Sequence, residues 1–314
     1  MSHPAEPGVE PSVTPCGAVW TYAKDDRAPL VLDATPKVMG IVNVTPDSFS
    51  DGGRFLSPRR AVEHALRLVD EGAEILDLGA ESTRPGGGVY GAGCDEVSAE
   101  DELQRLLPVL EDLRRRLPDT WISIDTRKGA VARRVLQAGA DLINDVGGLG
   151  DPELVAAVAE SGCPVVVMHS RGELATMQKD VVYDDVVQDV AAELKGRIER
   201  GLARGLRAPQ IIVDPGIGFA KTAEHNFQLL AQLDRLAALG YPILLGASRK
   251  SFIGSLDGSS AAGRLGGSLA AAAWAATCGV SILRVHDVKE TTQLLKVWNT
   301  IHLSRPGRDG IAPV

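Results

Sequence analysis

Polar side chains stand at the ends of a series of short apolar segments in this 314-residue chain. Each apolar segment is typical of a buried strand, and the polar residue lies at its end or within the last few residues. These residues are Asn43, Asp125, Asn144, Asp145, His169, Asp214, Arg284 and His286. If the strands are parallel, their carboxyl ends meet at one edge of the sheet, and we expect the polar side chains to gather there in one site.

The charges of these residues are sorted along the chain. Asp125, Asn144 and Asp214 offer oxygen acceptors, which suit a planar heterocycle that carries N–H donors. The later strand ends are basic, with Arg249, Lys250, Arg284 and His286. Such cations suit a phosphate group, and the alternative is that they pair with the nearby carboxylates. The residues alone indicate an enzyme that binds a polar planar group and a phosphate.

The apolar segments alternate with amphipathic segments of helical length. The apolar segments are residues 38–44, 74–79, 121–125, 141–146, 164–169, 211–215, 242–247 and 281–286. Between them, SPRRAVEHALRLVDEGA predicts a helix with Ser57 as its N-cap, and DPELVAAVAESG predicts one with Asp151 as its N-cap. Repeated strand–helix units of this kind predict an α/β fold, a (β/α)₈ barrel of about 250 residues. An open doubly wound sheet is disfavoured, because no Gly-x-Gly-x-x-Gly turn follows the first strand.

The chain is expected to form one domain. The barrel is predicted over residues 37–302, with a small N-terminal appendage over 18–36. Residues 1–17 are rich in proline, and they and residues 303–314 are expected to be flexible ends.

Composition narrows the classes of function. The formal net charge of −8 argues against a general affinity for nucleic acid or for an anionic membrane. The four cysteines lie far apart without a C-x-x-C pair, which indicates neither a zinc motif nor a disulfide framework. The N-terminus lacks the basic start and apolar core of a signal peptide. We therefore expect a soluble, cytoplasmic protein that acts on small molecules.

Seven segments of the chain resemble the dihydropteroate synthase family of the folate pathway. They are MGIVNVTPDSFSDGG, DLGAESTRPG, SIDT, IND, VDPGIGF, GASRKSFIG and RVHDV. They follow the order of the family and cover residues 38 to about 300. The polar stretch after the first strand then resembles a loop that closes over the reacting groups.

The resemblance implies a reaction and a cofactor. (7,8-Dihydropterin-6-yl)methyl diphosphate would react with 4-aminobenzoate to give 7,8-dihydropteroate and diphosphate, with Mg²⁺ assisting the loss of diphosphate. Because the attacking amine is an aniline, it is unprotonated at neutral pH and needs no strong base. The main demand on the protein is to stabilise the negative charge that builds on the leaving diphosphate.

The same resemblance implies roles for individual residues. The residues implied in catalysis are Asp51, Arg84, Lys250, Arg284 and His286. The pterin would be held by Asp125, Asn144, Met168, Asp214 and Lys250. The diphosphate would meet Asn43, Thr83, Arg284 and His286, and Asn43 would also meet Mg²⁺. The 4-aminobenzoate would lie against Phe49, Thr83, Arg84, Pro85, Pro215, Phe219 and Ser251.

Two other classes of protein are alternatives. A pterin-binding methyltransferase of the corrinoid type would share the barrel and the pterin-binding acids, but it would not need the SRKSF and RVHD cations. A non-catalytic paralogue would be expected to have lost loop residues such as Asp47, Asp51 or Arg84, which this chain retains.

Two further residues have expected roles or differences that do not bear on this choice. His169 is expected to be structural. Ala220 stands where the family often has glycine.

A segment rich in small residues predicts self-association. Residues 261–279 read AAGRLGGSLAAAAWAATCG, which predicts a helix that another helix can approach closely. The resemblance implies a homodimer formed through this helix and the last one. Close packing of the helix onto its own barrel is the alternative.

Overall fold

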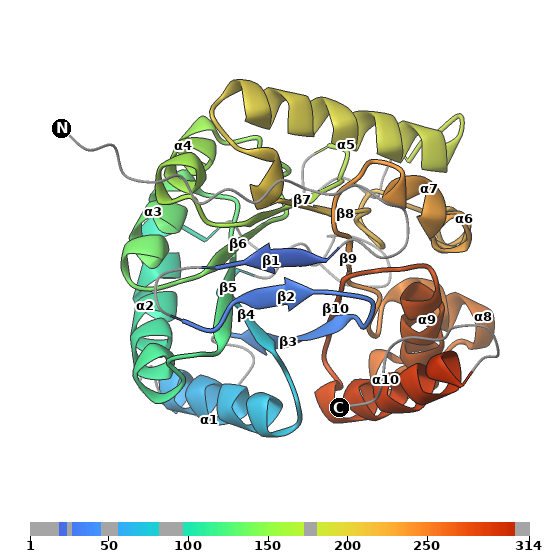
Figure 1. The fold of residues 1–314 in the computed structure, drawn as a ribbon, viewed down its shortest axis with the longest axis horizontal. Helices are drawn as coiled ribbons and strands as arrows, with labels where there is room; N and C mark the ends of the chain where they lie inside the picture. Colours follow the sequence, from blue (N-terminus) through green and yellow to red (C-terminus); the bar gives the residue numbers. More distant parts are fainter. Residues whose placement is uncertain (1–18, 24–26, 45–55, 82–96, 173–180, 305–314) are drawn as a thin grey trace.

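A closed barrel of parallel strands forms the centre of the protein (Figure 1). The computed structural model describes residues 19–23, 27–44, 56–81, 97–172 and 181–304. The strands pair in the order β8, β7, β6, β5, β4, β3, β10, β9. Their bounds are β3 Lys37–Asn43, β4 Ile75–Gly79, β5 Trp121–Asp125, β6 Leu142–Asp145, β7 Val165–Met168, β8 Ile211–Asp214, β9 Leu244–Leu245 and β10 Ile282–Val285. A parallel bridge between Val213 and Ile243 closes the ring, so the predicted (β/α)₈ barrel is confirmed.

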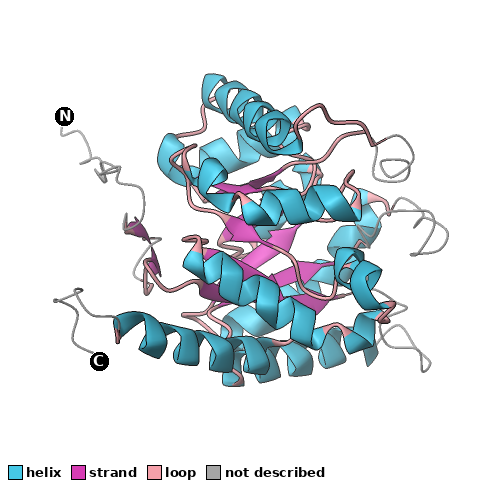
Figure 2. Ribbon diagram, turned by 90° about the vertical axis from the view of Figure 1, so that its right-hand side faces the viewer, coloured by secondary structure: helices cyan, strands magenta, loops and turns pink. Residues whose placement is uncertain are grey.

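Helices surround the strands on the outside (Figure 2). They are α1 Leu56–Asp70, α2 Ala99–Arg116, α3 Gly129–Gln137, α4 Pro152–Ser161, α5 Val186–Ala203, α6 Ala223–Ala231, α7 Leu233–Ala237, α8 Ser251–Asp257, α9 Leu265–Thr277 and α10 Val288–Leu303. Their apolar sides meet the outward-facing strand residues in one large buried cluster. None of the helices in these ranges combines the length and the apolar character needed to cross a membrane.

The caps of two helices were predicted, and one prediction is wrong. Asp151 caps α4 as expected, since its Oδ1 accepts a hydrogen bond from the backbone N–H of Glu153 at 2.8 Å. By contrast, α1 begins at Leu56, so Ser57 is the second residue of the helix and not its N-cap. The N–H groups of the first turn have no acceptor inside the helix, so a proline such as Pro58 is tolerated throughout that turn.

The segment 261–279 is not one continuous helix. A 3₁₀ turn over Ala261–Gly263 comes first, and α9 then spans Leu265–Thr277. The two are separated by Arg264, whose guanidinium donates to the carbonyls of Ser259 and Arg249 at 3.0 and 3.1 Å. Glycine also lowers helix propensity at this junction.

A short hairpin covers the amino-terminal end of the barrel. Strands β1 (Trp20–Tyr22) and β2 (Leu30–Leu32) pair antiparallel, and they cross the middle of the barrel in Figure 1. Their side chains join a cluster with residues from the starts of the barrel strands, such as Met39, Ile75 and Trp121. The chemistry of the strand ends therefore lies at the opposite, carboxyl-terminal end.

Candidate active site

The carboxyl ends of the strands bring the predicted pterin-binding residues together. Asp125, Met168 and Asp214 are the last residues of β5, β7 and β8. The strand register places Asp125 beside Asn144, and Met168 beside Asp214. All four side chains are buried. The polar groups are thus held on rigid strands and withdrawn from bulk water.

Arg284 of β10 bridges two carboxylates at this end of the barrel. Its Nε donates to Asp77 Oδ2 at 2.6 Å, and its Nη2 donates to Asp125 Oδ2 at 2.9 Å. Asp77 is fully buried and also accepts hydrogen bonds from Ser123 and Asn144, at 2.5 and 3.2 Å. The guanidinium is therefore committed to carboxylates in this structure, and it also fixes the orientation of Asp125.

One oxygen of the Asp125 carboxylate is not used in hydrogen bonding by the described residues. Within the described part of the chain, its Oδ1 is buried and has no hydrogen-bond partner. Burial raises the pKa of Asp125 to about 7, against the opposing effect of the Arg284 cation. A ligand that presents an N–H donor to this oxygen would relieve the cost of the unpaired acceptor.

Asp214 and Lys250 form the other side of the same site. Burial raises the pKa of Asp214, while the nearby Lys250 cation lowers it. Burial likewise lowers the pKa of Lys250 to about 8, with Asp214 acting in the opposite direction. The Lys250 ammonium donates to the Ile217 carbonyl and lies 4.6 Å from the centre of the Phe219 ring. Phe219 belongs to the same small buried cluster as Met168, and its ring gives the site an aromatic wall.

The predicted phosphate-binding cations divide into two groups. Lys250 and Arg284 face the site, and His286 lies beside Ser248, with 3.1 Å between His286 Nδ1 and Ser248 Oγ. Arg249 instead pairs with Asp287 through both its Nε and its Nη2. Its inclusion among the phosphate-binding cations is therefore not supported: Arg284 also pairs with carboxylates, but those belong to the site residues Asp77 and Asp125, whereas Asp287 is not one of the site residues. This is the pairing that the sequence left open.

The remaining predicted residues within the described ranges lie around this group. Asn43 ends β3 with an exposed side chain, beside Gly79 of β4. Pro215 is buried directly after β8. Ser251 is the first residue of α8. Phe49, Asp51, Thr83, Arg84 and Pro85 lie outside the described residues, so the structure does not place them.

Comparison with known proteins gives this arrangement a family. The pterin binding enzyme family matches residues 39–286. The chain is 44% identical over 265 residues to the dihydropteroate synthase of Haemophilus influenzae, covering 84% of this chain and 94% of that one. The chain belongs to the pterin-binding enzyme family, among the dihydropteroate synthases.

Solved structures of dihydropteroate synthases agree in fold. The enzyme of Xanthomonas albilineans with 4-aminobenzoic acid superposes with a TM-score of 0.81 at 45% identity, covering 88% of this chain and 96% of that one. The enzyme from the same organism in complex with 7,8-dihydropteroate gives a TM-score of 0.77 at 42% identity, covering 88% and 97%.

Several polar residues of this synthase fold were missed from sequence. Asp77 lies in the middle of the apolar segment EILDLG, and Ser123 lies in WISID. A charged residue inside a buried strand has to be paired, and that signal could have identified Asp77. Lys221 was also missed. It lies two residues after Phe219, and its side chain is buried, which is rare for lysine.

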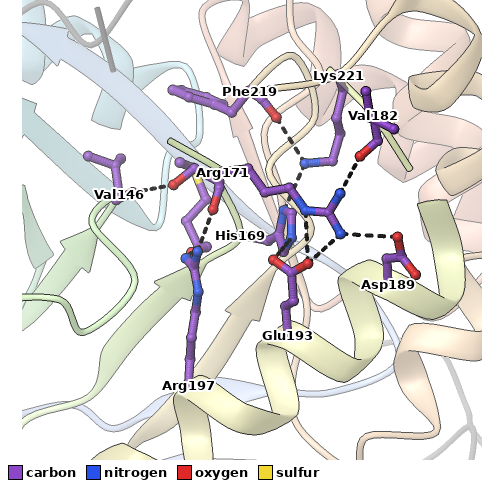
Figure 3. Close-up of polar contacts among 11 residues, drawn as sticks. Val146, His169, Arg171, Val182, Asp189, Glu193, Arg197, Phe219 and Lys221 are labelled. Carbon is purple, nitrogen blue, oxygen red and sulfur yellow. Dashed lines mark hydrogen bonds and ion pairs between the residues drawn. The ribbon is translucent and has the colours of Figure 1, made fainter. Parts of the chain in front are cut away.

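A second cluster of polar side chains lies behind the site, and His169 links its members Lys221 and Glu193 (Figure 3). Its Nδ1 lies 3.0 Å from Lys221 Nζ, and its Nε2 lies 3.1 Å from Glu193 Oε2. Arg171 donates to the other Glu193 oxygen at 2.8 Å through its Nε. Burial lowers the pKa of His169 to about 4, with the Glu193 hydrogen bond opposing the shift. The ring is therefore neutral at pH 7, with Nε2 donating to Glu193.

The acid side of the stability curve should depend on His169. In the unfolded chain the imidazole takes up a proton below a pKa of about 6.5, whereas in the folded chain it does so only near pH 4. The unfolded state then binds more protons, so stability falls as the pH drops from 6.5 towards 4, by up to about 3 kcal/mol. We expect the free energy of urea unfolding to depend less on pH over this range in His169→Gln than in the wild type. Parallel curves for the variant and the wild type would contradict the assignment.

Proposed function

We propose that this chain condenses (7,8-dihydropterin-6-yl)methyl diphosphate with 4-aminobenzoate to form 7,8-dihydropteroate and diphosphate. The observation that carries the proposal is the group of buried acceptors Asp125, Asn144 and Asp214, in which Asp125 Oδ1 accepts no hydrogen bond from the described residues. The pyrimidine edge of a pterin carries N–H donors that match such acceptors. The relatives from Xanthomonas albilineans with 4-aminobenzoic acid and with 7,8-dihydropteroate support this choice of ligands.

The proposed site has one part for the pterin and another for 4-aminobenzoate. In the proposed complex, Asp125, Asn144, Asp214 and Lys250 hold the pterin, with Met168 beside it. The ring of 4-aminobenzoate lies against Phe219 and Pro215, and its carboxylate meets Ser251. Phe49, Thr83, Arg84 and Pro85 complete that subsite in this proposal, and Asp51 and Arg84 act in catalysis.

The residues present fit a bound Mg²⁺. Mg²⁺ binds oxygen ligands, and it commonly takes one or two protein ligands together with substrate phosphates and water. Asn43 offers an exposed amide oxygen at the end of β3. No cluster of three potential ligands among His, Cys, Asp and Glu occurs within the described ranges, so we propose that Asn43 and the diphosphate hold the ion. When bound, Mg²⁺ would offset charge on the departing diphosphate.

The protein's own side chains have the same task. Arg284, His286 and the hydroxyl of Thr83 are proposed to bind the diphosphate, and Arg284 would also keep Asp125 oriented towards the pterin. Arg284 is half-buried and has further donors beyond the two that the carboxylates use. A fixed cation in a dry site stabilises developing negative charge without reorganising water.

Product identification tests this function. The purified chain is incubated with dihydropterin diphosphate, 4-aminobenzoate and Mg²⁺, and the products are identified by mass spectrometry. We expect 7,8-dihydropteroate, with formation lost in excess EDTA and restored by Mg²⁺. Methyl transfer from methyltetrahydrofolate to a corrinoid, without dihydropteroate, would instead favour the methyltransferase alternative. Absence of both reactions would favour a non-catalytic paralogue.

We also propose that the chain acts as a cytoplasmic homodimer. Helices α9 and α10 expose large apolar side chains, with Trp274, Val297 and Ile301 at 49%, 56% and 61% exposure. Exposed apolar side chains on adjacent helices are a common feature of interfaces between subunits. The wide spacing of the cysteines supports the proposed compartment.

Light scattering should report a mass of twice 33.1 kDa for the wild type at micromolar concentration. Val297→Glu with Ile301→Glu places charges in the proposed interface, and we expect it to shift the mass towards the monomer. Leu256→Glu is the control, because Leu256 is 73% exposed on the separate helix α8. A monomeric wild type would contradict the proposal.

A further inference from the structure

A buried lysine lies directly behind the aromatic wall of the site. Lys221 is 4% exposed, and its Nζ donates to the Phe219 carbonyl at 3.0 Å. The same nitrogen lies 3.0 Å from Nδ1 of His169, as Figure 3 shows. Methionine would fill a similar space without a polar atom, and burial of an amine is costly. The contacts of this amine therefore need an explanation.

The backbone that Lys221 holds is an unusual turn. Gly216, Gly218 and Ala220 have φ values of 68°, 82° and 47°, all in the left-handed region. Ala220 is not a glycine, so its conformation is strained and has to be held by its surroundings. Hydrogen bonds hold the turn at several points, including Gly216 N–H to Asp214 Oδ1 at 2.7 Å. Lys221 adds a donor at Phe219, next to the strained residue.

The turn has no room to shift towards His169. A Cβ atom added to Gly216 would lie 1.8 Å from the backbone oxygen of His169. The His169 ring is held in turn by Glu193, and Glu193 is held by Arg171. The support behind the turn thus runs from Arg171 through Glu193 and His169 to Lys221.

The other side of the turn is the site itself. Lys250 donates to the Ile217 carbonyl and lies over the Phe219 ring. Two lysines therefore hold the same turn from opposite sides, one at Ile217 and one at Phe219. Lys250 faces the proposed pterin site. Lys221 instead bonds to His169 and Phe219 and is buried, so its amine contacts protein groups behind the turn.

We propose that Lys221 is a positioning residue, which fixes residues 216–220 from behind so that the Phe219 ring forms a rigid wall for 4-aminobenzoate. The inference rests on the proposed function, and it assigns to Lys221 an effect on the second substrate. Among the proposed pterin acceptors, Asp125 and Asn144 lie on other strands and are held by Arg284 and Asp77, and Asp214 is fixed as the last residue of β8 by its pairing with β7. Loss of the Lys221 amine should therefore weaken 4-aminobenzoate binding much more than pterin binding.

Steady-state kinetics with three variants tests the inference. Lys221→Met removes the amine and keeps the volume, and Lys221→Gln keeps an N–H donor without the charge. Lys195→Met is the matched control, since Lys195 is a 70% exposed lysine on α5. We expect Lys221→Met to raise KM for 4-aminobenzoate at least tenfold and Lys221→Gln to raise it less. The dissociation constant of 6-hydroxymethyl-7,8-dihydropterin, measured by calorimetry, should change less than threefold in both.

Urea unfolding, read together with the affinities for both substrates, separates a positioning role of Lys221 from a general structural role. Because Lys221→Met leaves the Phe219 carbonyl and His169 Nδ1 without their donor, we expect a lower midpoint of urea unfolding, together with a pterin affinity within threefold of the wild type. An unchanged KM would overturn the inference, and so would a fall in stability with both substrates weakened equally. If Lys221→Met does not fold, the same comparison is made with Lys221→Gln. A wild type that forms no dihydropteroate would reject the proposed function, whereas an active wild type with unaffected variants would reject only the role of Lys221.

Discussion

Replacing Arg284 by methionine should lower the free energy of unfolding by about 3–5 kcal/mol, the range for removing one partner of a buried ion pair. Arg284 bridges Asp77 and Asp125, at 2.6 and 2.9 Å, and both carboxylates are buried. Without the guanidinium, two neighbouring carboxylates would lose their shared cation. Asp125 would then take up a proton more readily, because the cation that opposes its raised pKa is gone.

Turnover should be lost in the same variant, since Arg284 is proposed to bind the diphosphate. Adding Asp77→Asn to Arg284→Met should recover part of the stability but none of the turnover, because it removes one of the unpaired charges. Arg115→Met, at a 76% exposed arginine on α2, is the control and should leave stability nearly unchanged. The bridge would be unimportant if urea unfolding gave the same midpoint for Arg284→Met and the wild type.

Asp214→Asn should reduce the affinity for dihydropterin about 100-fold. The Asp214 carboxylate already accepts the Gly216 N–H through Oδ1, at 2.7 Å, and its other oxygen is proposed to accept from the pterin. An asparagine has only one acceptor oxygen, so either the turn or the ligand would face an NH₂ group. A hydrogen bond to a charged group contributes about 1.5–3 kcal/mol, and about 1.4 kcal/mol corresponds to a tenfold change.

Calorimetric titration of 6-hydroxymethyl-7,8-dihydropterin measures this loss. Asp112→Asn provides the same chemical change on the outer surface of α2, where Asp112 pairs with Arg115 and Arg116, and it should bind as the wild type does. Equal affinity in Asp214→Asn and the wild type would mean that the proposed orientation of the pterin is wrong.

Much of the fold was predictable because the strand signal is local. Each barrel strand is a short apolar run, and parallel strands place their last residues at one edge whatever the details of the loops. Asp125, Asn144 and Asp214 could therefore be grouped from their positions in the sequence alone. Asp151 was predicted as a cap for the same reason, because a cap bonds only to residues next to it.

The pairing of charges was not predictable in this way. Arg284 and Asp77 are 207 residues apart in sequence, and which carboxylate the guanidinium contacts depends on strand register and side-chain conformation. Arg249 and Lys250 are neighbours in sequence, yet Arg249 turns to Asp287 while Lys250 faces Phe219. Lys221 gave no local signal either, because its burial results from the turn that precedes it and from His169, which lies 52 residues away.

The central claim is that both substrates react within one site at the carboxyl end of the barrel. The most direct measurement is the ratio of 7,8-dihydropteroate formed to diphosphate released, determined in the same samples at several concentrations of 4-aminobenzoate. The account predicts a ratio of one, with both products rising together as 4-aminobenzoate is added. Diphosphate release at the same rate with and without 4-aminobenzoate, and with no dihydropteroate formed, would contradict it.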